Sequence, residues 1–495
     1  MNDEGVHCDI ELADRVVRLC DDEKSKIFKE FQKETNTKLK PTQREKIKDW
    51  AKEQGVELPD TKATTIKKLD PQFSEVLKKA FALMEKANKA SVAKFKKILL
   101  QCDSYGIIYD ILAYHKAHTG RYAGQGAQFQ NMKRPPSKFN MSKTISVVMS
   151  SSLPLLSLMY PNVMEIFANI TRGVIIPPPG KRLMVVDYAS MEMRILTWIV
   201  ENEEKLNQIR EGVDVYCKAA SVIYGYPCNP KDHKDERFVG KVAELALGYQ
   251  GGIGALVRMA NQYGLDLAPL FSVLWFSSTI EEREKAEWSY NHYLKTFYSN
   301  EENEGYTPAP PEVGLTADLI KQRWREANPQ VVRYWAQVES AAMVAVETRE
   351  PVVLGKLTFF TYKQFLMVKL PSGRTMAYPY PRVVKDDKGR RKLVYWSGDK
   401  KKNIPNFGCP TYGGKLVENI VQAIQRDLTV YGILKVRRTV YQIYFHVHDE
   451  FVAAVPIGEG SLEEFERLMS EGDTWTEGLP IAVEGWEGMR YGKAA

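Results

Sequence analysis

Two apolar runs that lie far apart in this chain end in acidic residues. The run Leu183–Val186 ends at Asp187, and a segment with helical apolar spacing follows, so Asp187 is predicted at a strand-to-helix turn. Near the C-terminus, the β-rich runs Val440–Phe445 and Phe451–Val455 flank Asp449–Glu450. This pattern predicts a hairpin with acids at its bend. The chain therefore presents carboxylates at the ends of strands from distant segments.

Between these acids, the pattern from about 201 to 345 is mostly helical, and one stretch of it places cations at helical spacing. Arg237, Lys241, Leu245 and Tyr249 recur every four residues, so on a helix they occupy a sector of about 120°. Such a face offers two cations to phosphates and an apolar-aromatic platform to a base. The alternative is an ordinary amphipathic helix with surface cations.

Together these features match the needs of nucleotidyl transfer. Paired carboxylates bridge two divalent ions about 3.5–4 Å apart, one at the attacking hydroxyl and one at the triphosphate. Asp187 and Asp449 are the candidates. Taken singly, an aspartate that ends a strand is more often a turn or cap residue than a metal ligand.

Charge points to the N-terminal segment as a nucleic-acid contact. The formal net charge is +7, and residues 21–100 hold 20 Lys or Arg against 13 Asp or Glu. The lysines there are spaced so that an amphipathic helix would present several on one side, which suits phosphate contact or a solvated face. They are Lys86, Lys89, Lys94, Lys96 and Lys97.

The cysteines and the N-terminus bear on the compartment. None of the six cysteines forms a C-x-x-C pair or a zinc-like spacing with histidine, which favours reduced thiols. The first residues lack a secretory signal, and no apolar run approaches the roughly 20 residues needed to span a bilayer. These observations predict a cytoplasmic protein that does not contact a membrane.

The order of these strings resembles family A DNA polymerases, the group that contains bacterial polymerase I and many bacteriophage replicative enzymes. The resemblance implies an α+β right-hand fold, with an antiparallel palm sheet and a helical thumb and fingers. It rests on five segments. Asp187–Arg194 is similar to motif A, Arg237–Tyr249 to motif B and Val447–Glu450 to motif C. Thr119–Asn131 is similar to the primer-binding segment, and Tyr412–Asp427 to the phage-type segment before motif C.

The resemblance also implies roles. Asp187 and Asp449 would hold two Mg²⁺ ions, with Mn²⁺ as a substitute, and Glu450 would support them. Glu192 would exclude a 2′-hydroxyl, and Lys241 would contact the α-phosphate region and donate a proton to pyrophosphate. The other implied dNTP contacts are Arg237, Leu245, Tyr249 and Tyr188, and the expected DNA contacts are Arg121, Gln130, Asn131, His448, Gln422 and Lys94.

The expected domains follow the motifs: 1–118 an N-terminal helical region and thumb, 119–200 the first part of the palm, 201–347 the fingers, and 348–495 the second part of the palm. No function is assigned to 265–311. Two positions depart from the family pattern, Leu245 where many members carry Phe and Ala246 where glycine is common.

Only 120 residues precede Arg121, and the first of them resemble the junction after the exonuclease of phage polymerases. We therefore expect a polymerase without the 3′–5′ exonuclease domain, whether a naturally split protein, a gene fragment or an exonuclease-free replicase.

The predicted function is template-directed DNA synthesis on a primer, in phage replication and without proofreading. A separate exonuclease, helicase or single-strand-binding protein are candidate partners. One alternative is a single-subunit RNA polymerase, against which Glu192 argues. Another is a catalytically silent or partner-dependent subunit that binds primed DNA, which Asp187 and Asp449 disfavour because carboxylates facing a polyanion repel it unless cations intervene.

Overall fold

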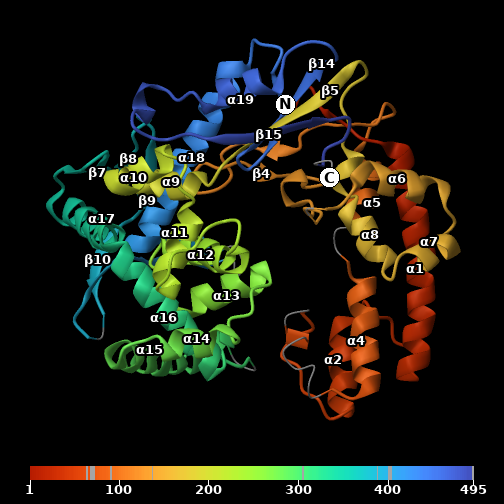
Figure 1. The fold of residues 1–495 in the computed structure, drawn as a ribbon, viewed down its shortest axis with the longest axis horizontal. Helices are drawn as coiled ribbons and strands as arrows, with labels where there is room; N and C mark the ends of the chain where they lie inside the picture. Colours follow the sequence, from red (N-terminus) through yellow and green to blue (C-terminus); the bar gives the residue numbers. More distant parts are fainter. Residues whose placement is uncertain are drawn as a thin grey trace.

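The computed structural model describes residues 1–62, 65–66, 73–89, 92–136, 138–303, 306–386, 388–399 and 404–492. A mixed sheet-and-helix unit lies at the top of Figure 1, with a helical lobe below it on either side. The N-terminal lobe is drawn in red and orange, and the second lobe in yellow-green to teal. The predicted α+β class, with an antiparallel sheet and two helical lobes, is confirmed.

The central sheet is built from strands that lie far apart in the sequence. Its order is β13-β14-β5-β15, and every neighbouring pair is antiparallel. The predicted strand before Asp187 and the predicted C-terminal hairpin are both confirmed. The first hairpin strand begins and ends later than expected, and the second is one residue longer at each end. The strands are β5 (Lys181–Tyr188), β13 (Ile443–Val447), β14 (Glu450–Pro456) and β15 (Val483–Gly488).

Both faces of this sheet are covered, which explains why β5 is apolar on both sides. Successive side chains of a strand point to opposite faces. Met184 and Val186 pack into one apolar cluster with α18 (Gly413–Val436), whereas Leu183 and Val185 pack into a second cluster with the N-terminal lobe. Helices α9 (Met191–Ile199) and α19 (Leu462–Ser470) also lie beside the sheet (Figure 1).

The N-terminal lobe has its own core, which continues past residue 118. The long helix α1 packs on α4 and α5 and also on α6, α7 and α8, so the predicted boundary between 1–118 and 119–200 cuts through one apolar cluster. The helices are α1 (Ile10–Thr35), α2 (Arg44–Glu53), α4 (Glu75–Ala87), α5 (Ala93–Gln101), α6 (Met141–Ser150), α7 (Leu153–Met159) and α8 (Val163–Asn169).

The lysine-rich segment does not form the single helix that its spacing suggests. Helix α4 ends at Ala87 and α5 begins at Ala93. The lysines therefore do not share one helix face: Lys96 pairs with Asp21 at 2.8 Å, and Lys89 pairs with Glu165 at 2.7 Å. Some of the lysines that were expected to contact nucleic acid are thus paired with acidic residues of the same lobe.

The predicted helical stretch from about 201 to 345 is confirmed, and the segment 265–311 contributes α14, α15 and the start of α16. Its helices are α10 (Glu203–Arg210), α11 (Val215–Tyr224), α12 (Lys234–Leu247), α13 (Ile253–Tyr263), α14 (Leu270–Phe276), α15 (Ile280–Tyr298), α16 (Pro311–Ala327) and α17 (Pro329–Thr348).

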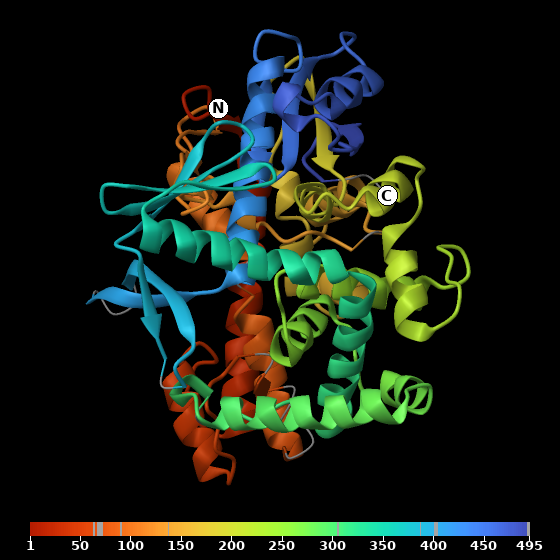
Figure 2. The ribbon, with the colours of Figure 1, turned by 90° about the vertical axis from the view of Figure 1, so that its left-hand side faces the viewer.

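Two sheets follow α17 that the sequence reading did not foresee. They pair in the orders β6-β7-β8-β9 and β10-β11-β12, and within the described residues they share no ladder with the central sheet. Figure 2 shows α17 beside both of them. The strands are β6 (Val352–Leu354), β7 (Leu357–Tyr362), β8 (Phe365–Lys369), β9 (Thr375–Pro379), β10 (Arg382–Lys385), β11 (Arg391–Asp399) and β12 (Ile404–Thr411).

Short elements complete the described chain. Two ladders of two residues per strand pair β1 (Val6–His7) with β2 (Ile107–Ile108) and β3 (Leu112–Ala113) with β4 (Ala123–Gly124). Among the described residues, no helix is long and apolar enough to cross a membrane. The 3₁₀ turns are η3 (Phe129–Asn131), η4 (Arg172–Val174), η5 (Glu301–Asn303) and η6 (Thr474–Thr476).

The packing of α12 on α11 predicts a sharp steric effect at Gly240. A Cβ atom there would lie 2.1 Å from the Tyr216 carbonyl oxygen, so Gly240→Ala must push the two helices apart. We expect a loss of unfolding free energy of about 1–3 kcal/mol, measured by urea denaturation. Gly254→Ala on α13 is the control, because its added Cβ meets its nearest neighbours at 3.5 Å. Equal stability of the two variants would contradict the close approach.

Candidate active site

The sheet register brings the two aspartates together. Asp187 lies one residue before the end of β5, and Asp449 lies in the turn between β13 and β14, the strand that pairs with β5. The Tyr188 N–H donates to the Asp449 carbonyl oxygen at 3.3 Å, which ties the turn to the end of β5. The predicted convergence of Asp187 and Asp449 is therefore seen in the fold.

A side chain from a distant segment holds the turn that carries Asp449. His448 adopts the left-handed conformation with φ of 55°, which turns the chain sharply. The Gln130 side chain accepts a hydrogen bond from the His448 N–H at 2.7 Å and donates one to the His446 carbonyl at 2.8 Å. Gln130 was expected to contact DNA, but its amide is buried and used on the hairpin.

The two aspartates carry negative charge that the protein compensates only in part. Burial, followed by the charges of Asp449 and Glu450, raises the pKa of Asp187 to about 7. Burial and the charge of Glu192 raise the pKa of Asp449 to about 6. Arg134 lies 3.6 Å from Asp187, and sequence reasoning had not singled it out. Ionising these carboxylates costs free energy, and a bound cation would lower that cost because it favours the charged form.

This donor set fits a hard divalent cation. Two carboxylates offer oxygen ligands, and Mg²⁺ commonly binds one or two carboxylates and takes its other ligands from water and substrate phosphates. Among the described residues, no group of three or more His, Cys, Asp or Glu is arranged to hold a metal ion alone. The arrangement therefore suits an ion that arrives with substrate better than a permanently caged one.

Glu450 occupies a different environment from the two aspartates. It faces Asp187 across the strands and is 7% exposed. The Tyr491 hydroxyl donates to it, and Arg172 and Arg134 lie 3.6 and 3.7 Å away. Because these partners already neutralise its charge, Glu450 is better placed to support the site than to bind a metal. No spacing in the sequence links Tyr491 or Arg172 to this residue.

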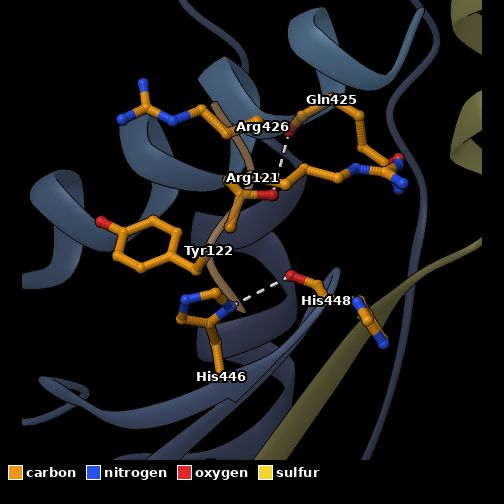
Figure 3. Close-up of a pocket in the computed structure, with 7 residues that line it drawn as sticks. Arg121, Tyr122, Gln425, Arg426, His446 and His448 are labelled. Atoms are coloured by element: carbon orange, nitrogen blue, oxygen red, sulfur yellow. Dashed lines mark hydrogen bonds between the residues drawn. The ribbon is translucent and has the colours of Figure 1, made fainter. Parts of the chain in front are cut away.

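A chain of polar contacts joins Glu192 to Asp449. Arg121 Nη2 donates to Glu192 Oε1 at 2.6 Å and also to the Gln425 side-chain oxygen. Gln425 Nε2 donates to Asp449 Oδ2 at 2.8 Å, and the Tyr249 hydroxyl lies 3.5 Å from Glu192 Oε2. Figure 3 shows the Arg121 and Gln425 side chains pointing toward each other beside His448. Gln425 is a site residue that the sequence reading missed.

Helix α12 presents three of the four residues expected on its face. Arg237, Lys241 and Leu245 lie on the helix, but Tyr249 follows its end, because α12 stops at Leu247 and is capped by Gly248. Gly251 makes a close approach here, since a Cβ there would lie 2.0 Å from the Ala246 carbonyl oxygen. The expectation of one continuous face was wrong for Tyr249.

The two cations of α12 already have partners. Arg237 Nε donates to Asp214 at 2.7 Å, and its guanidinium lies 5.3 Å from the centre of the Tyr216 ring. The Lys241 ammonium lies 5.8 Å from the centre of the Tyr263 ring. Both cations are partly exposed, so a polyphosphate can compete for them.

The Tyr188 side chain does not reach a nucleotide. The strand alternation that points Asp187 one way points Tyr188 the other, into the core. Its ring is 4% exposed and meets Phe451 edge to face, with centroids 5.1 Å apart. The expectation of a dNTP contact through this side chain was wrong for that reason.

The remaining expected DNA contacts differ in their availability. Lys94 donates to the carbonyls of Ala127 and Gln128 at 3.1 and 3.0 Å, so its ammonium holds the loop before Gln130. Asn131 is exposed and donates to the Gln128 side chain at 3.3 Å. His448 is exposed at the turn, and Gln422 is half-buried on α18, where it donates to Glu418 at 3.2 Å.

Sequence reasoning also missed the buried charges that hold the segment before Arg121. Arg374 Nη2 donates to the Thr119 carbonyl at 3.0 Å, and Arg426 Nε donates to the Gly120 carbonyl at 3.1 Å. Both arginines pair with Asp427, at 2.6 and 3.2 Å. Arg374 comes from the β8–β9 turn, in a sheet that was not predicted.

This fold and site define a nucleic-acid polymerase, and comparison with known proteins agrees. The sequence model of DNA polymerase family A matches residues 25–297. A DNA polymerase of Bacillus phage SP02 is 30% identical over 502 residues, which cover 100% of this chain and 69% of the relative. DNA polymerase I of Rhizobium leguminosarum is 26% identical over 134 residues, covering 27% of this chain and 13% of that protein.

A solved structure shares the fold. The polymerase domain of Pol1 from M. smegmatis, in complex with a DNA primer-template and dNTP, superposes with a TM-score of 0.62 at 14% identity, covering 99% of this chain and 68% of that one. The chain belongs to DNA polymerase family A. It is a template-directed DNA polymerase, and enzymes of this family use divalent metal ions.

His446, beneath the turn, predicts an acid-sensitive stability. Burial lowers its pKa from 6.5 to about 4, so between these values the unfolded chain binds a proton that the folded chain excludes. The folded state with a neutral His446 is therefore fully stable above about pH 6.5, and it loses stability as the pH falls toward 4. Relative to His446→Asn, we expect wild type to lose up to about 3 kcal/mol of unfolding free energy across this window.

The measurement is urea denaturation of both proteins at several pH values between 4 and 7. His292→Asn is the control, because His292 is exposed on α15. A wild-type minus His446→Asn difference that does not change with pH would contradict the prediction.

Proposed function

We propose that this polymerase extends a primer 3′ end by nucleotidyl transfer with two Mg²⁺ ions held by Asp187 and Asp449. The observation that carries the proposal is the convergence of these two carboxylates at one end of the sheet, with both pKa values raised. Bound magnesium would activate the primer 3′-hydroxyl and offset the triphosphate charge. Glu450, held by Tyr491 and Arg172, keeps the pair of strands in register beneath them.

The residues of α12 and its C-terminal end bind the nucleotide. Arg237 and Lys241 exchange their present partners for phosphate oxygens, where each cation stabilises charge that grows in the transition state. Lys241 also donates the proton to the leaving pyrophosphate. Tyr249 and Leu245 contact the base and sugar. Both side chains are half-buried and supply apolar surface near the two cations of α12.

The primer terminus is held by groups from other segments. Arg121 reaches the minor groove at the primer end, since its guanidinium contacts Glu192 and also Gln425, which in turn contacts Asp449. His448, exposed at the hairpin turn, binds the primer-end phosphate, while Asn131 and Gln422 face the DNA strands. Gln130 and Lys94 act indirectly, by fixing the hairpin and the loop before it.

The lobes take the roles that the family resemblance implies. Residues 201–347 act as fingers and residues 1–118 as the thumb region, with a shared core extending the latter through α8. The sheet segments from 119–200 and 348–495 form the palm. The phage relative favours a role in phage DNA replication. The candidate partners are a separate exonuclease, helicase or single-strand-binding protein.

The first test is extension of a labelled primer on a DNA template with Mg²⁺ and dNTPs, comparing wild type with Asp449→Asn. We expect the rate to fall by at least about 1,000-fold, roughly 4 kcal/mol of transition-state stabilisation, because one metal ligand is lost. Asp14→Asn is the control, since Asp14 lies on α1 and pairs with Arg18. Wild-type rates for Asp449→Asn would contradict the proposal.

The same experiment separates the alternatives. Primer binding without extension by wild type would favour a silent or partner-dependent subunit. A lane without nucleotides tests the expectation that this chain does not degrade the primer.

A second test addresses Glu192 as the sugar selector. Glu192→Ala removes the side chain proposed to block a 2′-hydroxyl, so ribonucleotide incorporation relative to deoxynucleotide should rise at least tenfold, about 1.4 kcal/mol. Glu192→Gln keeps the size of the side chain and should preserve the selectivity if the block is steric. Single-nucleotide incorporation kinetics with dNTP and rNTP measure the ratio. Unchanged discrimination in Glu192→Ala would remove the assigned role.

A further inference from the structure

We infer that Gln425 is a positioning residue that aligns the primer-binding Arg121 with the catalytic Asp449. The inference rests on the roles proposed above for Arg121 and Asp449. It concerns Gln425 on α18, whose own side chain is uncharged. Its effect would pass through both neighbours, so we do not count it among the groups that touch the reacting atoms.

The contacts of Gln425 connect the two functions directly. Its side-chain oxygen accepts from Arg121 Nη2, and its Nε2 donates to Asp449 Oδ2 at 2.8 Å. One amide therefore spans the distance from the primer-end arginine to a metal ligand. The Asp449 Oδ1 atom is not part of this contact.

The polarity of the amide suits these partners in one orientation. A guanidinium only donates hydrogen bonds and a carboxylate only accepts them, so the oxygen must face Arg121 and the nitrogen must face Asp449. Gln425 is 5% exposed, so losing either contact would strand a buried polar group. The amide therefore resists rotation and restricts both neighbours to one arrangement.

The support beneath Gln425 is rigid. The Thr429 hydroxyl donates to the Gln425 carbonyl at 2.9 Å on α18. The next residue, Arg426, fixes the Gly120 carbonyl, and Arg374 fixes the Thr119 carbonyl, through the network built on Asp427. The backbone before Arg121 and the helix that carries Gln425 are thus tied together by buried ion pairs.

Arg121 also links this contact to the nucleotide side. Its Nη2 bonds both Gln425 and Glu192, and Glu192 lies beside the Tyr249 hydroxyl. The primer end, the sugar selector and the metal ligand therefore share one set of hydrogen bonds. Displacing Arg121 from Gln425 would misplace the primer end relative to Asp449, and a misplacement of about 1 Å can cost on the order of 100-fold in rate.

The test is single-turnover incorporation by Gln425→Met, which keeps the size of the side chain but loses both hydrogen bonds. We expect the maximal incorporation rate to fall at least tenfold, while the Kd for primed DNA, measured by fluorescence anisotropy without nucleotide, changes less than threefold. Gln322→Met on α16 is the matched control, because Gln322 also makes two side-chain hydrogen bonds, at 2.8 and 3.0 Å. It should keep the wild-type rate.

A second variant and a mutant cycle separate positioning from a loss of folding. Gln425→Glu keeps an acceptor for Arg121 but sets a carboxylate against Asp449, so it should lose at least as much rate as Gln425→Met. The mutant cycle compares the fold-loss of rate that Gln425→Met causes in two backgrounds. This fold-loss should be at least threefold smaller in an Arg121→Ala background than in the wild-type background. Urea denaturation checks that all variants are folded.

The outcomes separate this inference from the proposed function. If Asp449→Asn is inactive but Gln425→Met incorporates at the wild-type rate, or the cycle is additive, the positioning role is wrong and the polymerase site stands. If Asp449→Asn is fully active, the proposed site itself is wrong. A large rise in Kd with an unchanged maximal rate would assign Gln425 to DNA binding instead, which also overturns the inference.

Discussion

The structure depends on the antiparallel pairing of β5 with β14, which sets two carboxylates side by side at one end of a buried sheet. Burial, followed by repulsion from nearby negative charges, disfavours the ionised carboxylates, and the raised pKa values of Asp187 and Asp449 express that cost. The apolar packing on both faces of the sheet offsets this repulsion. The carboxylates are thus held in place before any cation or substrate reduces the repulsion between them.

Around this sheet, the protein uses buried polar contacts to position groups that come from remote segments. Gln130 holds the hairpin turn, Tyr491 and Arg172 hold Glu450, and Gln425 holds Arg121 against Asp449. Most of these contacts join residues hundreds of positions apart. A polar side chain that is buried with both of its hydrogen-bond ends satisfied has one low-energy orientation, which gives the site its geometry.

The lobes contribute groups that still have alternative partners. Arg237 and Lys241 of α12 contact Asp214 and the Tyr263 ring at partly exposed positions, where phosphate oxygens can replace them. The contacts around the central sheet are more deeply buried. In the proposed site, the groups that would receive the nucleotide therefore carry the exchangeable interactions, and the groups that would hold the metal ions carry the buried ones.

The amino-acid sequence by itself determined the elements whose physics is local. The apolar run before Asp187 and the β-rich runs around Asp449 specify strands and a turn, and the helical spacing between 201 and 345 specifies the second lobe. The order of the motifs identified the family. The tertiary structure alone decided that both faces of the central sheet are covered, and it placed the Tyr188 ring in the core.

The tertiary structure also supplied the partners that no sequence spacing encodes. Gln425, Arg374, Asp427 and Tyr491 meet their contacts through long-range packing, and the end of α12 depends on a close approach at Gly251. Local patterns report the period of a strand or helix, because that period follows from backbone geometry. The pairing of a buried polar group depends on which distant segment packs against it, and only the assembled fold determines that.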